Sequence, residues 1–283
     1  MFEIWRPALS ESIDGKPLAT SISHLFWEFP YDRLPENSTS LNIFLRPEGM
    51  LVMLIFYLNS KPLFQTLYES VKPTKGKAWF TASVALHNLA LALFSAIVAY
   101  NSWPIVAGHW MDRGFMDTYC DNNGVLWQES GFGAWVVIFY LSKYYEFVDS
   151  WVLVLKGKKP SFLQVYHHTG ICFCMWAGTL SQGSWLIYVV LFNSVIHTLM
   201  YTYFFIKTIN PQAEIKAAKY LTTAQIGQFF TGIGCSCSIL FMGDSCNSSS
   251  SRFGLACLNT YGIGLIALFM SFAKKKYSSK KTA

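Results

Sequence analysis

The chain has 283 residues, of which 52% are hydrophobic, 17% aromatic and only 13% charged. A soluble domain usually carries about 25% charged residues, so this composition argues against a soluble protein and favours a membrane protein. The net charge of +6 does not indicate a nucleic-acid partner, because the lysines form short blocks between apolar stretches and at the C-terminal end. Basic segments in these places are typical of the loops that flank transmembrane helices.

Seven apolar stretches are candidates for transmembrane helices, since a span needs about 20 mostly apolar residues. The first stretch is the weakest, because Lys61 and Pro62 interrupt it, and a count of six spans would omit it. The sequence therefore predicts an all-α, polytopic membrane protein that forms a single domain over residues 1–283. The expected helices lie near residues 49–67, 78–101, 132–155, 162–180, 185–207, 220–242 and 253–273.

Lysine and arginine residues predict how the chain is oriented in the membrane. The loops after the first, third and fifth expected helices are rich in lysine, whereas the opposite loops hold only Arg113 and Arg252. We therefore expect the lysine-rich loops and the basic tail, residues 274–283, in the cytosol, and the N-terminal segment, residues 1–47, on the far side. The lysines in question are Lys72, Lys75, Lys77, Lys156, Lys158, Lys159, Lys207, Lys216 and Lys219.

Two glycosylation sequons and two cysteines fall in segments expected on the far side. The sequons begin at Asn37 and Asn247, and their placement agrees with the predicted orientation. Cys120 and Cys246 lie in far-side loops, where oxidation is permitted. Either a disulfide between them or two free thiols fits the sequence, because spacing does not fix connectivity.

The chain ends in Lys280-Lys281-Thr282-Ala283. A dilysine at the fourth and third positions from the end of a cytosolic tail resembles a retrieval signal of the endoplasmic reticulum. A basic tail that merely flanks the last helix is the alternative. The first interpretation predicts a multi-pass protein of the endoplasmic reticulum membrane with a cytosolic C-terminus.

Ionisable and amide side chains occur inside four successive apolar helices, where a charge at mid-bilayer costs roughly 2.5–3.5 kcal/mol. Within each helix their spacing of three or four residues places them on one face, while Tyr203 lies off this line on another side of its helix. One such stripe is explained by interhelical packing, but four favour a polar reaction chamber, with His87 and Asn88 as its wall or as packing residues. The stripes are Lys143, Glu146 and Asp149; Gln164, His167 and His168; Asn193, His197 and Tyr201; and Thr222, Gln225 and Gln228.

Three kinds of function fit buried histidines. Neutral imidazole is a nucleophile and a base near pH 7, and a buried chamber shelters an acyl-imidazole from water. Clustered histidines also bind non-haem iron, but membrane desaturases and hydroxylases resemble one another in needing about eight. This chain has six histidines, with His24 and His109 outside the expected chamber, so we expect neither a metal nor another cofactor. A seven-helix transporter or receptor is the third alternative, although no repeat-related discontinuous helices support a transporter.

The stripes resemble the motifs of the ELO family of very-long-chain fatty acid elongases, in the family's order over residues 143–228. Three positions depart from the pattern: Ser150 stands in place of Thr, Phe204 in place of the last Tyr, and Gln164 in place of the first His of the box. The matches are Lys143-x-x-Glu146-x-x-Asp149-Ser150 to KxxExxDT, Gln164-x-x-His167-His168 to HxxHH, Asn193-x-x-x-His197-x-x-Met200-Tyr201-x-Tyr203 to NxxxHxxMYxYY, and Thr222-x-x-Gln225-x-x-Gln228 to TxxQxxQ.

The resemblance implies a 3-ketoacyl-CoA synthase of the endoplasmic reticulum, which condenses acyl-CoA with malonyl-CoA and releases CO2 and CoA. Helices two to seven would surround a narrow acyl tunnel. In a ping-pong reaction the second His of the box, His167 here, would be acylated. His197 would stabilise charge or move protons during decarboxylation, and His168 and Asn193 would orient these groups. The substrate site would include Gln164, Lys143, Glu146, Asp149, Tyr201, Tyr203, Gln225 and Gln228.

Gln164 keeps a hydrogen-bonding group where the family usually places an imidazole, which argues against an indispensable role for that imidazole. Glutamine at this place resembles the algal and microbial elongases that act on polyunsaturated acyl chains. The implied partners are acyl-CoA, malonyl-CoA, membrane lipid, and the reductases and dehydratase of the elongation cycle, but no nucleic acid; a homodimer stays open. Cytosolic cations are candidate contacts for the CoA phosphates, namely Lys156, Lys159 and Lys207.

Overall fold

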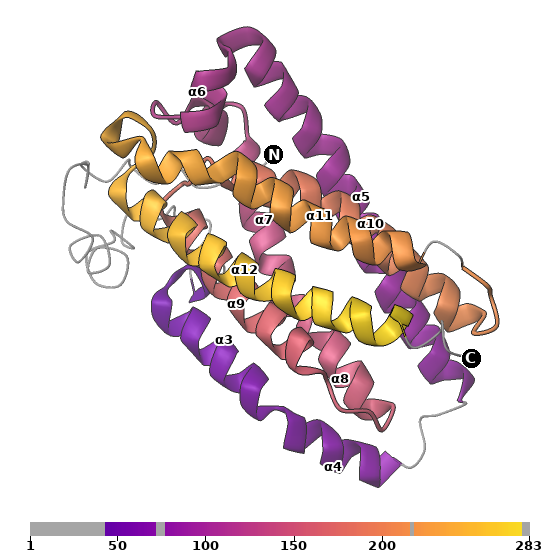
Figure 1. The fold of residues 1–283 in the computed structure, drawn as a ribbon. Helices are drawn as coiled ribbons and strands as arrows, with labels where there is room; N and C mark the ends of the chain where they lie inside the picture. Colours follow the sequence, from indigo (N-terminus) through magenta and orange to yellow (C-terminus); the bar gives the residue numbers. More distant parts are fainter. Residues whose placement is uncertain (1–42, 72–76, 216–217, 279–283) are drawn as a thin grey trace.

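The computed structural model describes residues 43–71, 77–215 and 218–278, and within them every regular element is helical (Figure 1). His24, the Asn37 sequon, the lysines at 72, 75 and 216 and the dilysine at 280–281 lie outside the described residues. The α-helices are α3 (Pro47–Asn59), α4 (Lys61–Val71), α5 (Ala78–Arg113), α6 (Phe115–Cys120), α7 (Phe132–Tyr145), α8 (Phe147–Leu155), α9 (Phe162–Leu180), α10 (Leu186–Ile209), α11 (Ala218–Ser236) and α12 (Ser249–Ser278). Short turns of other helix types are η4 (Val125–Glu129), η5 (Cys237–Phe241) and η6 (Gly243–Ser245).

The protein is an all-α, multi-pass membrane protein, as its sequence predicts. Among the described residues four helices are long and apolar enough to cross a membrane, namely α5, α10, α11 with its extension to Phe241, and α12. The helices α3 and α4, bent by 45° against each other, make a fifth span if they are counted together. The expected number of seven is therefore not confirmed. The third expected span is too short to count, because α7 stops after 14 residues at Tyr145. The fourth is too polar to count, because α9 carries Gln164, His167 and His168.

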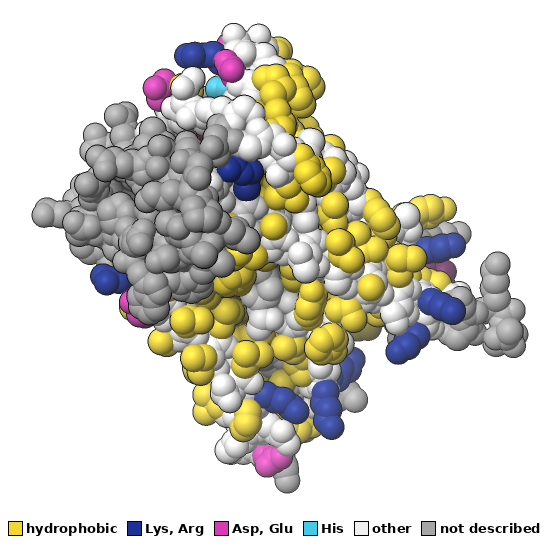
Figure 2. All heavy atoms as spheres, turned by 60° about the vertical axis from the view of Figure 1, so that its left-hand side comes forward, with side chains coloured by type: hydrophobic (Ala, Val, Ile, Leu, Met, Phe, Trp, Pro, Cys, Tyr) yellow, Lys and Arg dark blue, Asp and Glu magenta, His cyan; other side chains and the backbone are white. Residues whose placement is uncertain are grey.

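The outer surface of the helices is apolar. Large hydrophobic side chains such as Leu86, Tyr100 and Ile263 are exposed, and only 11% of the apolar window of α11 is buried inside the protein. Figure 2 shows hydrophobic side chains spread over the helices between groups of charged side chains at the ends. Contiguous apolar surface of this extent indicates contact with lipid.

Six helices close a ring. Going round it, α5 packs against α10, α10 against α11, α11 against α12, α12 against α9, α9 against α7, and α7 again against α5 (Figure 1). These are the second to seventh of the expected helices, the set that the family resemblance places around a tunnel. Outside the ring, α3 packs against α9 and α4 against α8.

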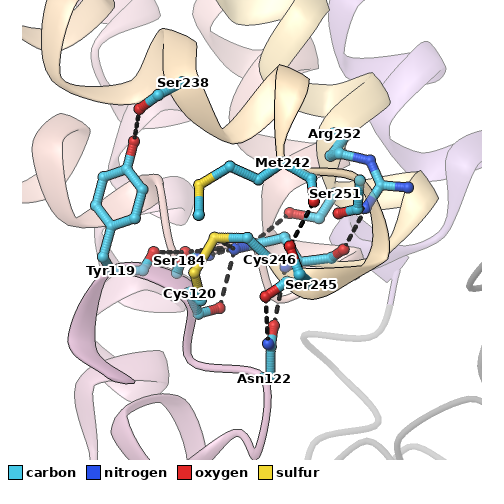
Figure 3. Close-up of a disulfide and its surroundings, with 12 residues drawn as sticks. Tyr119, Cys120, Asn122, Ser184, Ser238, Met242, Ser245, Cys246, Ser251 and Arg252 are labelled. Atoms are coloured by element: carbon cyan, nitrogen blue, oxygen red, sulfur yellow. Dashed lines mark hydrogen bonds between the residues drawn. A yellow bond between two sulfur atoms is a disulfide. The ribbon is translucent and has the colours of Figure 1, made fainter. Parts of the chain in front are cut away.

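At one end of the ring a disulfide joins two distant loops. Cys120 and Cys246 are bonded across 126 positions of sequence (Figure 3). The disulfide expected as one of two alternatives is therefore confirmed, and it ties the end of α6 to the segment that precedes α12.

Asn247, next to this disulfide, is a buried structural residue. Its side-chain nitrogen donates to the Cys120 carbonyl at 2.9 Å and to the Ser184 hydroxyl at 2.8 Å. Its side-chain oxygen accepts from the Ser184 amide at 3.0 Å and from the Ser251 hydroxyl at 2.9 Å. A glycan on this nitrogen is incompatible with such packing, so this sequon gives no support to the predicted orientation.

Candidate active site

The ring of six helices encloses two adjoining cavities of very different size. The larger has a volume of about 640 Å³ and the smaller about 70 Å³. His167, Asn193 and Gln228 line both of them. Every predicted site residue except Lys143 lines the larger cavity, so the four stripes do face one another. These residues are Glu146, Asp149, Gln164, His167, His168, Asn193, His197, Tyr201, Tyr203, Gln225 and Gln228.

The position of Tyr203 differs from what helical spacing predicts. The sequence places it off the stripe of α10, on another side of that helix. In the structure it nevertheless lines the larger cavity together with Tyr201. A wide cavity explains the difference, because it covers a broader sector of the helix than a single stripe.

The box of α9 is set in place by a helix cap. Ser161 precedes the helix, and its hydroxyl accepts a hydrogen bond from the Gln164 backbone amide at 3.2 Å. A serine in this position satisfies an amide that has no partner within the helix. The cap thereby fixes the first turns of α9, which carry His167 and His168.

Lys143 and Glu146 form a buried ion pair at the break between α7 and α8. Both side chains are at most 2% exposed, and 2.7 Å separates the ammonium nitrogen from Glu146 Oε1. The ammonium also lies 3.8 Å above the ring of Phe139 and donates to Asn193 Oδ1 at 3.4 Å. Buried charges cost several kcal/mol each unless they are paired and hydrogen-bonded, and these contacts supply that compensation.

Asp149 belongs to a different group, although it was expected to extend the stripe of Lys143 and Glu146. Its Oδ1 lies 2.8 Å from His87 Nε2, and its Oδ2 accepts from the Tyr201 hydroxyl at 2.7 Å. His87 Nδ1 in turn lies 3.2 Å from the Tyr145 hydroxyl. The sequence assigned no chemistry to His87. The signal that could have found it is the adjacent pair of polar residues, His87 and Asn88, inside an apolar helix.

Three histidines surround the junction of the two cavities. The ring centre of His167 lies 5.5 Å from that of His168 and 6.5 Å from that of His197. His168 and His197 are buried, whereas His167 is only partly buried and is therefore accessible from the cavities. Among the three, His167 is the imidazole that a cavity-bound substrate can reach most directly.

Several buried polar atoms around this junction lack a hydrogen-bond partner within the described part of the chain. His197 Nδ1 lies 3.4 Å from Glu146 Oε1, but the two are not aligned as a hydrogen bond. Buried polar atoms without partners are rare in proteins and call for an explanation. Here they point to polar groups of a bound substrate. The atoms are Glu146 Oε2, His168 Nδ1, His197 Nδ1 and Gln228 Oε1.

The same junction contains a set of potential metal donors. Donor atoms of Glu146, His167 and His197 all lie within 4.8 Å of one another. However, Lys143 already occupies Glu146 Oε1, and an ammonium group repels a second cation at the same oxygen. The donor set therefore fits a metal poorly while this ion pair is intact.

The larger cavity also reaches three lysines. Lys207 donates to the carbonyls of Pro211 at 2.6 Å and Ala213 at 3.1 Å, which holds the following loop. Burial, and to a lesser extent the neighbouring Lys158, lowers the pKa of Lys156 from its ordinary value. Lys159, although expected as a phosphate contact, does not line this cavity. The cations that do are Lys156, Lys207 and Lys276.

Comparison with known proteins shows the family of the chain. The sequence model of the ELO family, described as the GNS1/SUR4 family, matches residues 43–283. Long chain fatty acid elongase 2 of Caenorhabditis elegans is 31% identical over 204 residues, which is 71% of this chain and 74% of the relative. Fatty acid elongase sre1 of Dictyostelium discoideum is 32% identical over 69% of this chain and 72% of the relative. Fatty acid elongase 2 of Trypanosoma brucei brucei is 30% identical over 69% and 76%, respectively. The chain therefore belongs to the ELO family and is a membrane enzyme of fatty acid elongation.

Proposed function

We propose that the protein is a 3-ketoacyl-CoA synthase that carries the acyl chain on His167. One observation supports this most directly: His167 is the accessible imidazole at the junction of a wide cavity, which the polar stripes line, and a narrow apolar one. A thioester carbonyl placed there lies beside this imidazole.

In the first half-reaction, a nitrogen of His167 attacks the thioester carbonyl of acyl-CoA. A carbon–nitrogen bond forms, the carbon–sulfur bond breaks, and CoA leaves as a thiolate that takes up a proton from water on release. The acyl group stays on the imidazole as a reactive intermediate. Its enclosure by six helices keeps bulk water away from it.

In the second half-reaction, malonyl-CoA loses CO2, and the electron pair of the broken carbon–carbon bond forms an enolate. The enolate carbon attacks the acyl group, and the bond from this group to His167 breaks. His167 leaves as a neutral imidazole that keeps its one ring proton. The negative charge that develops on the enolate needs donors in a dry site. We assign that task to His197 and Asn193, with Lys143 and Glu146 holding their neighbourhood in place.

The cavities also suggest how the substrates lie. The cationic side of the larger cavity, with Lys156, Lys207 and Lys276, suits the phosphates of CoA. The smaller cavity is lined by aromatic rings together with the amides of Gln228 and Asn259. Its volume of about 70 Å³ is too small for a long acyl chain, so the proposal of a polyunsaturated substrate rests on Gln164.

We further propose that the protein resides in the endoplasmic reticulum with its C-terminus in the cytosol, and that it supplies 3-ketoacyl-CoA to a reductase and a dehydratase. The lysine-rich side of the larger cavity and the disulfide at the other end of the ring support this orientation, because disulfides persist in oxidising compartments. Replacement of both Lys280 and Lys281 by serine tests the location. A tagged protein that remains in the endoplasmic reticulum after this change contradicts the retrieval signal.

The reaction is tested with microsomes that contain the wild-type protein or His167→Ala. The wild type should join acyl-CoA to labelled malonyl-CoA with release of CO2, and the variant should not. Iron that co-purifies with the protein and is required for activity supports the desaturase alternative instead. Solute flux without CO2 release supports a transporter.

The substrate class is tested in yeast that expresses the protein. Cells are fed separate polyunsaturated and saturated acids of equal chain length, and their lipids are analysed. Products longer by two carbons from the polyunsaturated acids only are the expected result. Elongation of the saturated acids alone contradicts the proposed substrate class but leaves the reaction intact.

A further inference from the structure

Tyr261 is a buried residue of α12 that lies outside all four sequence motifs. It is 8% exposed and stands 94 positions from His167 in the sequence. Its hydroxyl nevertheless lies 2.8 Å from His167 Nδ1 and 3.0 Å from the backbone carbonyl oxygen of the same residue. Among the described residues it is the only side chain that is hydrogen-bonded to the imidazole of His167.

Both contacts are hydrogen bonds at the same time in only one arrangement of the protons. A carbonyl oxygen only accepts hydrogen bonds, and a tyrosine hydroxyl has a single proton to donate. The Tyr261 proton therefore goes to the His167 carbonyl, and the Tyr261 oxygen accepts from Nδ1. Nδ1 of His167 must then carry the ring proton, which leaves the lone pair on Nε2.

We propose that Tyr261 is a positioning residue that presents Nε2 of His167 as the nucleophile. This inference rests on the proposed acylation of His167. Without the hydroxyl, the proton can move to Nε2 and the ring can rotate, and neither state attacks a thioester from that nitrogen. A partner that selects one tautomer and one ring orientation is a recurrent requirement of histidine catalysis.

Tyr261 also acts during the reaction. Attack through Nε2 places positive charge on the imidazole ring while Nδ1 keeps its proton. The hydrogen bond from Nδ1 to the tyrosine oxygen becomes charge-assisted at that moment, and such bonds are shorter and stronger than neutral ones. An interaction that strengthens in the transition state raises kcat more than it changes KM.

The neighbouring tyrosine provides a matched control. Tyr166 stacks on Tyr261 with 5.3 Å between ring centres, and its hydroxyl donates to the Tyr261 carbonyl at 3.3 Å. It is not hydrogen-bonded to His167 and lines neither cavity. Tyr166→Phe therefore removes a hydroxyl from the same stacked pair without touching the proposed nucleophile.

The experiment compares purified wild-type, Tyr261→Phe and Tyr166→Phe proteins mixed with acyl-CoA alone. Rapid quenching gives the rate of CoA release and of acyl transfer to the protein, and the thermal unfolding of each protein is recorded in parallel. We expect Tyr261→Phe to acylate about tenfold more slowly, as for the loss of one good hydrogen bond. Its KM for acyl-CoA should stay unchanged, and Tyr166→Phe should acylate at the wild-type rate. Each variant loses buried hydrogen bonds, so we expect a small and similar decrease of Tm in both.

Acylation of Tyr261→Phe at the wild-type rate overturns the inference. A raised KM or a lowered Tm with an unchanged rate also overturns it, since that pattern shows a structural role. So does an equal loss of rate in Tyr166→Phe. Failure of the proposed function looks different, because the wild-type protein then releases no CoA and carries no acyl group in this assay.

Discussion

The Asn247 amide beside the disulfide and the polar groups at the junction of the cavities are buried in opposite ways. Beside the disulfide, the amide of Asn247 makes hydrogen bonds with both its nitrogen and its oxygen. At the junction of the cavities, Glu146 and two histidines each keep a buried atom without a partner in the described part of the chain. A fully satisfied buried group stabilises one conformation, whereas an unsatisfied one is a cost that persists where function requires it. Asn247 thus belongs to a structural joint, and the unpartnered atoms at the junction are what the substrate site that we propose would require.

The largest effect on stability should come from breaking the buried ion pair of Lys143 and Glu146. Lys143→Met leaves the Glu146 carboxylate buried without its cation, and removal of one partner of a buried pair costs about 3–5 kcal/mol. The double variant Lys143→Met/Glu146→Gln should recover part of that stability without recovering activity. Thermal unfolding in detergent measures both proteins. The exposed Lys158→Met serves as control, and a single variant as stable as this control refutes the account of the ion pair.

Removal of the disulfide should lower stability but spare the chemistry. The bond closes a long segment, since 126 positions separate its cysteines, and loss of a native disulfide typically costs about 2–4 kcal/mol. The test protein is Cys120→Ser/Cys246→Ser, with the exposed free cysteine variant Cys235→Ser as control. Condensation per folded molecule should equal that of the wild type. Loss of activity in protein that is still folded would contradict the division between the two ends.

The smallest effect concerns Asp121, which follows α6 at the disulfide end. Burial raises its pKa to about 6, although its carboxylate accepts hydrogen bonds from the backbone amides of Leu126 and Trp127 at 2.9 Å. The folded protein then binds a proton more tightly than the unfolded chain, so stability falls as pH rises from about 4 to about 6, by about 1–2 kcal/mol. Unfolding temperatures measured across this range should show the slope in the wild type and lose it in Asp121→Asn. The exposed Asp112→Asn should keep it.

The sequence predicts which residues line the larger cavity better than it predicts the hydrogen bonds between them. Polar stripes inside apolar helices and their motif order identify the residues that face the chamber, because each stripe depends only on spacing within one helix. The break of the helix at Glu146 is less visible, since no proline or glycine stands next to it in the sequence. The bonds from Asp149 to His87 and from His167 to Tyr261 join residues 62 and 94 positions apart. Such pairs are set by how helices pack together, which no single helix encodes.

The most direct test of the account is to locate the acyl group. Purified protein is incubated with acyl-CoA alone, digested, and analysed by mass spectrometry, with and without a later addition of malonyl-CoA. We predict an acyl adduct on the peptide that contains His167, absent from His167→Ala and discharged by malonyl-CoA. An adduct on another residue, or condensation by the His167→Ala protein, contradicts the assignment of His167 as the nucleophile.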